Sequence, residues 1–222
     1  MYISNRKQDL QASRRTEYIM DALYAMLGWA AWRPHEADLD KRGVDVVLRM
    51  PGAQAGLLVD EKAATRYWDR PLETYACELT CTRTRNGYGW FAKENNGYMV
   101  NTHLVLIWVR ALEKELIHVS SLRFLVVSKY DLQKYFEFAV GMTQKDDTKA
   151  FLANLPWDRN DRYTVNEDLA LIKCDICPEY PVNAIFSRNV LEKLAMYNGD
   201  FSRFEVRDAL RDARTAAGNL EK

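Results

Sequence analysis

Apolar residues recur with two different periods along the chain, and each period predicts one kind of element. From Gln8 to Ala31 they follow helical spacing, as at Ile19, Leu23 and Met26, and Pro34 lies just beyond. Short apolar runs that follow predict strands at 44–48, 57–62, 74–82, 103–110 and 122–127. A helix followed by a series of strands predicts an α/β protein with a central sheet.

The second half of the chain alternates helices with strands. Ser128 is a typical N-cap and Gly141 a typical stop for a helix over 129–140. We expect further helices at 143–155, 188–197 and 202–217, and strands at 163–176 and 182–186. No repeat or low-complexity linker separates the halves. We therefore predict a core over 1–141 and an α+β extension over 142–222, packed on the same body as one domain overall.

Charged residues interrupt the apolar runs at 44–48 and 57–62. Asp45 lies among valines, and Asp60 and Lys62 follow Leu57-Leu58-Val59. Burying such side chains is costly unless they are paired or bind a metal. The segment 50–56 contains a proline and two glycines, so the runs form a hairpin. Because side chains alternate along a strand, Asp60 and Lys62 share a face and Glu61 points the other way. If Asp45 faces the same side, two carboxylates and an ammonium converge.

Such a convergence suits phosphodiester hydrolysis. Two carboxylates bind a hard divalent cation such as magnesium or manganese through oxygen. The cation polarises a phosphoryl oxygen and lowers the pKa of a bound water. A lysine beside it orients that water or stabilises the charge that develops on phosphorus.

The pattern of Asp45 followed by Asp60-Glu61-Lys62 resembles the PD-(D/E)xK nuclease superfamily, although Val44 replaces the usual proline. The resemblance implies a restriction-endonuclease-like fold, a three-layer sandwich with a central mixed sheet flanked by helices. It also implies a magnesium-dependent endonuclease-like hydrolase acting on nucleic acid, with DNA the favoured substrate. Asp45, Asp60 and the main-chain carbonyl of Glu61 would hold the metal, and Lys62 would act on the water.

The resemblance also implies an acidic residue on the first helix near the metal, and Glu17 matches it. On a helical wheel Glu17 lies nearly opposite the stripe formed by Ile19 and Met26, so a solvated position is the alternative. The predicted strand at 74–82 contains Glu78, a further candidate acidic group.

Two segments combine arginines with aromatic residues. One follows Lys62, and the other is a hairpin marked by Asn86-Gly87. Arginines and aromatic rings contact phosphates and stack on bases, and the alternative is loops packed by their aromatic residues. The candidate nucleic-acid-binding residues are Arg66, Arg70, Arg83 and Arg85.

Composition narrows the class of protein. Hydrophobic residues make up 48% and charged residues 28%, and the formal net charge is zero, so nucleic-acid binding must use local patches. The longest uncharged apolar run, 104–109, is too short to span a membrane, and no signal-peptide core is visible at the N-terminus. We expect a cytoplasmic protein without membrane association. The oligomeric state stays open, a homodimer included.

Four cysteines, Cys77, Cys81, Cys174 and Cys177, could hold a structural zinc, but the first two fall in a predicted strand, so reduced thiols are favoured. Two alternatives to a nuclease remain. One is a non-catalytic binding or inhibitor protein, of phage or mobile-element origin, that retains a nuclease-like fold. The other is a zinc-stabilised scaffold.

Overall fold

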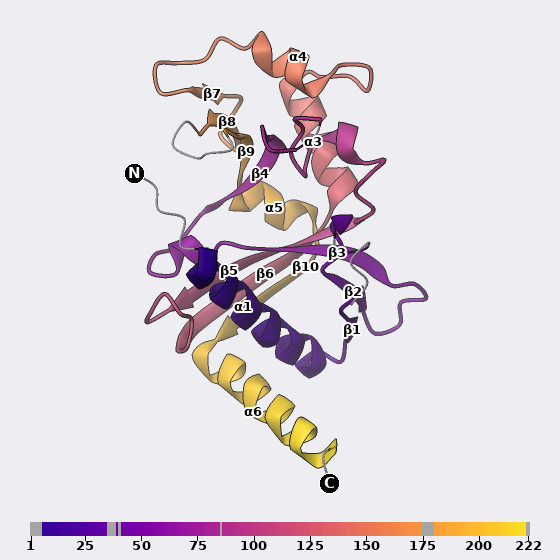
Figure 1. The fold of residues 1–222 in the computed structure, drawn as a ribbon, viewed down its shortest axis with the longest axis vertical. Coiled ribbons are helices and arrows are strands. Elements are labelled where there is room, and N and C mark those ends of the chain that lie inside the picture. Colours follow the sequence, from indigo (N-terminus) through magenta and orange to yellow (C-terminus); the bar gives the residue numbers. More distant parts are fainter. Residues whose placement is uncertain (1–5, 35–38, 40, 85, 175–179, 221–222) are drawn as a thin grey trace.

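The structure, a computed structural model, describes residues 6–34, 39, 41–84, 86–174 and 180–220. Its centre is a mixed six-stranded sheet (Figure 1). In spatial order the strands are β1 (Ala30–Trp32), β2 (Val46–Arg49), β3 (Leu57–Ala63), β5 (His103–Ala111), β6 (Val119–Ser128) and β10 (Ala195–Ser202). Only β3 and β5 pair in parallel, and the other neighbours are antiparallel.

The crossover from β3 to β5 contributes a strand to a second, antiparallel sheet. This sheet has the order β4 (Thr74–Thr80), β9 (Val182–Ser187), β8 (Leu169–Lys173) and β7 (Arg162–Thr164). Thus β4, from the first half of the chain, pairs with β9, while β10 returns to the central sheet beside β6.

Helices and the second sheet cover the two faces of the central sheet. The helices are α1 (Arg6–Met26), α3 (Lys129–Val140), α4 (Thr148–Ala153), α5 (Arg188–Leu194) and α6 (Arg203–Leu220). In Figure 1, α1 and α6 lie on one side of the central sheet, and α3, α5 and the second sheet lie on the other. A hydrophobic core lies on each face of the central sheet, and alternate residues of β5 pack into one or the other. Val105 and Ile107 face the α1 side, and Leu104 and Leu106 face the β4 side. None of the described helices has the length and apolar content that crossing a membrane requires.

The predicted mixed α/β class is confirmed, but several element boundaries were wrong. The first helix ends at Met26 rather than Ala31, because Gly28 turns the chain at φ +71° and Ala30–Trp32 pairs with β2. The helix expected to reach Tyr197 ends at Leu194, and the chain continues as β10.

Two further boundaries differ in the second half of the chain. The strand expected at 163–176 is the β7–β8 hairpin, and the helix expected at 143–155 is confined to Thr148–Ala153. The second sheet, which pairs β4 of the first half of the chain with strands of the second half, was not predicted. Pairing with distant strands overrode local propensity at these points.

The register of β2 on β3 leaves part of β3 open. The pairs run from Leu48↔Leu57 to Val46↔Val59, where the described pairing on that edge of β3 stops. The segment Asp60–Ala63 continues beyond it, still paired to β5 on its other edge. Asp60, Glu61 and Lys62, three of the residues predicted to form the site, lie on this segment.

Candidate active site at the open edge of β3

Asp45 lies directly before β2 and caps the open edge of β3. Its main-chain N–H donates to the carbonyl of Val59 at 2.9 Å, which extends the hairpin by one residue. Its carboxylate Oδ2 then accepts a hydrogen bond from the main-chain N–H of Glu61 at 2.7 Å. A side chain therefore satisfies the N–H that a neighbouring strand would otherwise satisfy. This bond fixes the Asp45 carboxylate beside the middle of Asp60-Glu61-Lys62.

Asp60 is a buried carboxylate with one oxygen uncompensated. The residue is only 1% exposed, and its Oδ1 accepts a hydrogen bond from Lys62 Nζ at 2.5 Å. Its Oδ2 is buried and has no hydrogen-bond partner among the described residues. Burial raises the pKa of Asp60 to about 7; Lys62 lowers it, and the nearby Asp45 carboxylate raises it. The site thus holds more negative charge than Lys62 alone compensates.

Lys62 lies between the buried carboxylate and solvent. Its side chain is 32% exposed, and Nζ lies 5.3 Å from the centre of the Trp90 ring, a cation–π distance. Burial lowers the pKa of Lys62, but the surrounding carboxylates outweigh this and raise it above the ordinary value. These carboxylates are Asp60, Asp45 and Glu78. Lys62 is therefore charged at neutral pH.

The side chain of Glu61 points to the opposite face, as strand alternation predicts. Its carboxylate accepts hydrogen bonds from Tyr24 Oη at 2.7 Å and from Arg33 Nη1 at 2.8 Å. Arg33 also pairs with Asp21 of α1 at 2.9 Å. Burial raises the pKa of Glu61, and Arg33 lowers it. This network ties β3 to α1, and it leaves only the main chain of Glu61 for a metal.

Glu17 lies at a cleft beside these residues. The cleft measures about 260 Å³, and its lining includes Glu17 of α1, Asp45, Glu61, Lys62 and Thr65. The buried Asp60 is not among the residues that line it. Glu17 is half-buried and accepts a hydrogen bond from Ser13 Oγ at 3.3 Å. The structure therefore places Glu17 at the cleft rather than on the fully solvated side of the helix.

Lys129 is a component of the site that the sequence pattern did not reveal. It is 3% exposed, and its Nζ donates to Asn101 Oδ1 at 3.3 Å. Burial lowers the pKa of Lys129 to about 8; the charge of Asp60 raises it and that of Lys62 lowers it. A lysine in the first turn of a helix opposes the helix dipole, and this was the available signal.

Three of the four candidate arginines lie within the described residues. Arg66 lies in the short 3₁₀ helix η1 (Thr65–Tyr67), next to Thr65 of the cleft. Arg70 stacks over the Tyr67 ring at 5.2 Å and lines a separate hollow with Trp108. Arg83 lies in the turn after β4. Arg85 lies outside the described residues.

Among the described residues, no cysteine lines the cleft. Cys77 and Cys81 are free and buried, and burial raises the pKa of the Cys77 thiol. A buried thiol of raised pKa is a poor source of thiolate. Cys174 is in a disulfide, so the reduced thiol expected at this position was wrong. Cys177 lies outside the described residues, and a zinc site formed by all four cysteines would require this disulfide to be reduced.

Asp45 and Asp60 nevertheless fit a divalent cation of magnesium type. Across the described part of the chain, no group of three or more His, Cys, Asp or Glu side chains is arranged to hold a metal. Magnesium keeps several waters and commonly uses only one or two carboxylates. The buried, unpartnered Oδ2 of Asp60 beside the Asp45 carboxylate is the donor set that such an ion requires.

Comparison of the chain with protein-family models, with curated proteins and with solved structures finds no match in any of the three. The site itself, with Asp45, Asp60 and Lys62 brought together from two strands, is therefore the feature that bears on function.

Proposed function

We propose that the protein is a metal-dependent nuclease that hydrolyses phosphodiester bonds in nucleic acid, with DNA as the first substrate to test. The observation that carries the proposal is the convergence of Asp45 and Asp60 beside Lys62, with one buried carboxylate oxygen unpartnered. The assignment to the PD-(D/E)xK superfamily and its restriction-endonuclease-like fold belongs to this proposal. It is supported by the placement of the motif on β3 and directly before the adjacent strand β2 of a mixed sheet.

Each of the candidate residues would have a role in this chemistry. Asp45 and Asp60, with the carbonyl of Glu61, would hold a magnesium or manganese ion. Bound there, the ion would polarise the phosphoryl oxygen and lower the pKa of a water. Lys62 lines the cleft and would hold its ammonium toward that water or toward the charge developing on phosphorus. Glu17, from the opposite wall, would orient the water shell.

One observation favours a non-catalytic binding protein as the second candidate. Lys62 interacts electrostatically with Asp60 and Asp45, and Lys129 with Asp60, so two positive charges can balance the two carboxylates without a metal. Lys62 is also held by Asp60 and by the Trp90 ring. A site balanced in this way could persist after catalysis is lost. Cleavage activity separates the two candidates.

The test is cleavage of labelled DNA and RNA, single-stranded and duplex, with magnesium or manganese at pH 8. At this pH the pKa of Asp60, about 7, leaves its carboxylate mostly ionised. Lys62→Met keeps an alkyl chain against the Trp90 ring and removes only the ammonium. We expect the cleavage rate to fall by roughly 10²–10³, as for loss of one preorganised donor, while the metal stays bound. Lys62→Arg should rescue poorly, because a planar guanidinium does not replace a compact ammonium.

Lys134 offers a matched control. Its ammonium also lies near an aromatic ring, Tyr130, at 5.4 Å and pairs with a carboxylate, Glu137, at 2.8 Å, and its exposure of 34% is close to that of Lys62. Lys134→Met should leave the rate unchanged. A Lys62→Met protein that cleaves at the wild-type rate would end the assignment of the catalytic motif. Absence of cleavage in the wild type with every substrate and metal would favour the binding protein.

A further inference from the structure

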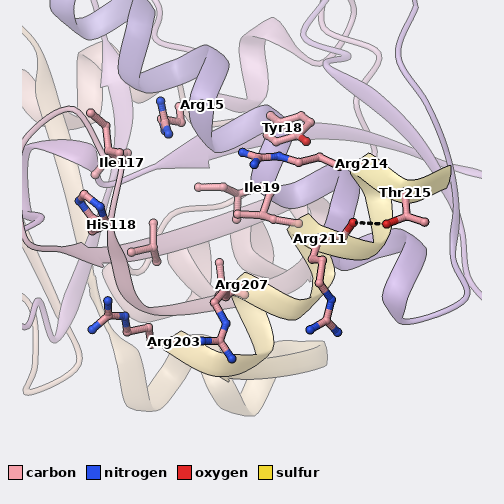
Figure 2. Close-up of a pocket in the computed structure, with 14 residues that line it drawn as sticks. Arg15, Tyr18, Ile19, Ile117, His118, Arg203, Arg207, Arg211, Arg214 and Thr215 are labelled. Carbon is pink, nitrogen blue, oxygen red and sulfur yellow. Dashed lines mark hydrogen bonds between the residues drawn. The ribbon is translucent and has the colours of Figure 1, made fainter. Parts of the chain in front are cut away.

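A second hollow lies away from the cleft, between α1 and α6. It measures about 500 Å³ and is closed at one end by the turn between β5 and β6 (Figure 2). Its floor is apolar, with Ile19 and Val206 almost fully buried. We refer to this hollow as the α1–α6 groove. Five arginines line it: Arg15 from α1, and Arg203, Arg207, Arg211 and Arg214 from α6.

The arginines of the groove form a row of exposed positive charge. Those of α6 recur at intervals of three or four residues, so they follow one side of the helix for about 16 Å at 1.5 Å per residue. Figure 2 shows Arg214 reaching from α6 toward Tyr18 on α1. Arg207 and Arg211 pair weakly with aspartates of their own helix at 3.3–3.6 Å. Within the part of the chain that the structure describes, Arg15, Arg203 and Arg214 have no ion-pair partner.

A row of cations on an apolar floor suits an extended polyanion better than a single small anion. Each guanidinium presents a fork of donors that matches a phosphate. Tyr18 is 43% exposed at the edge of the groove, where a base could stack on its ring. Phe204, 65% exposed on α6, lies under the Arg207 guanidinium at 5.3 Å. Arginines interleaved with exposed aromatic rings are the surface that single-stranded nucleic acid binds.

The groove and the candidate active site lie on the two flanks of one helix. Glu17 lines the cleft, and its neighbour Tyr18 lines the groove. Consecutive residues are about a quarter turn apart, so the two hollows are separated only by the outer surface of α1. Arg14 is exposed, and its place in the helical repeat puts it on this outer surface. A strand that crosses α1 at this point would pass from one hollow to the other.

We infer that the α1–α6 groove binds the phosphodiester backbone of a nucleic-acid strand and leads that strand across α1 to the cleft at β3. The part of this inference that concerns where the strand leads rests on the proposed function. Binding in the groove itself needs neither the metal nor Lys62.

The test measures binding without cleavage. Fluorescence anisotropy of a labelled mixed-sequence single-stranded oligonucleotide is recorded in EDTA over a series of salt concentrations. The groove variant is Arg15→Ala, Arg203→Ala, Arg214→Ala, which spares the arginines that pair with aspartates of α6. We expect affinity to fall by at least tenfold. The log–log salt slope should decrease by about 2, because each lost phosphate contact on a single strand removes about 0.7.

A matched variant removes three exposed cations elsewhere: Lys145→Ala, Arg159→Ala, Arg162→Ala. These residues lie in the segments around α4 and β7, at the far end of the molecule from α6 (Figure 1). It should bind like the wild type. Equal affinity and slope for the groove variant and the wild type would overturn the inference, as would a wild type that binds no oligonucleotide. If polyglutamate displaced the labelled strand as effectively as unlabelled oligonucleotide does, the groove would suit an acidic protein partner. That result would also overturn the inference.

The outcome for the groove is separable from that for the nuclease. If the groove variant loses binding but neither protein cleaves, the groove stands and the nuclease assignment fails. If the wild type cleaves, the groove variant should show a raised KM with little change in kcat, because its substitutions lie outside the cleft. A lowered kcat at an unchanged KM would contradict a strand-binding role.

Discussion

Replacing Asp60 with Asn should stabilise the metal-free protein at alkaline pH. Asp60 is 1% exposed, and burial with the neighbouring Asp45 charge raises its pKa to about 7 despite the pairing with Lys62. The folded state therefore binds a proton at Asp60 that the unfolded state releases at a lower pH. An amide of the same shape stands in for the protonated carboxyl and carries no charge that burial penalises.

The size of the effect follows from linkage. Because the pKa of Asp60 is raised on folding, its penalty is absent below about pH 4, grows as pH rises, and is complete above about pH 7. A shift from the usual 3.8 to about 7, at 1.36 kcal/mol per pKa unit, gives at most about 4 kcal/mol. Asp60→Asn should thus match the wild type near pH 4 and exceed its free energy of unfolding by up to about 4 kcal/mol at pH 8.

The assay is urea denaturation in EDTA at several values of pH between 4 and 8.5. Taking the difference between variant and wild type at each pH cancels the titration of all other groups. Asp69→Asn, at an exposed aspartate in the loop after η1, is the control and should show no such trend. Manganese should then stabilise the wild type and not Asp60→Asn, because only a carboxylate that binds the ion links its binding to folding.

A difference in unfolding free energy that does not change with pH would refute the reasoning. So would an Asp60→Asn protein less stable than the wild type at pH 8. Either result would mean that Asp60 is ionised and well compensated in the folded protein, with its second oxygen solvated or paired.

Two further predictions concern the neighbours of Asp60. The double variant Asp45→Asn, Asp60→Asn should stay folded and lose manganese binding in titration calorimetry, because both proposed carboxylate ligands are gone; unchanged affinity would remove the metal site. Arg33→Ala should lower the free energy of unfolding by roughly 3–5 kcal/mol, because it leaves the Glu61 side chain, 7% exposed, without its cation. Asp21→Ala, at the 44% exposed partner of Arg33, should cost less than about 1 kcal/mol in the same denaturation assay, and equal costs would contradict the central role of Glu61.

The sequence by itself determined the local features of the candidate site. The period-two alternation after Leu57 places Asp60 and Lys62 on one face and Glu61 on the other, as the structure shows. The turn at 50–56 gives a hairpin that brings Asp45 beside them. These relations involve residues within one hairpin, where alternation and turn chemistry decide the geometry. The alternation did not predict that the Glu61 side chain would pair with Arg33. Arg33 follows β1, and its position is fixed only when it pairs with Asp21 of α1.

The second sheet, the strands β1 and β10 and the α1–α6 groove became visible only in the tertiary structure. Strand β4 pairs with β9 across a separation of about a hundred residues, and β10 forms where local spacing predicted helix. The charge of Asp60 acts on Lys129 because β6 pairs with β5, so that the start of α3 lies beside the start of β5, which is next to Val59 of β3. Contacts of this kind depend on which distant segments pack against one another. The sequence of a short segment does not determine this. The arginines of α6 were visible as charges, but their gathering with Arg15 over an apolar floor required the packing of the two terminal helices against one face of the sheet.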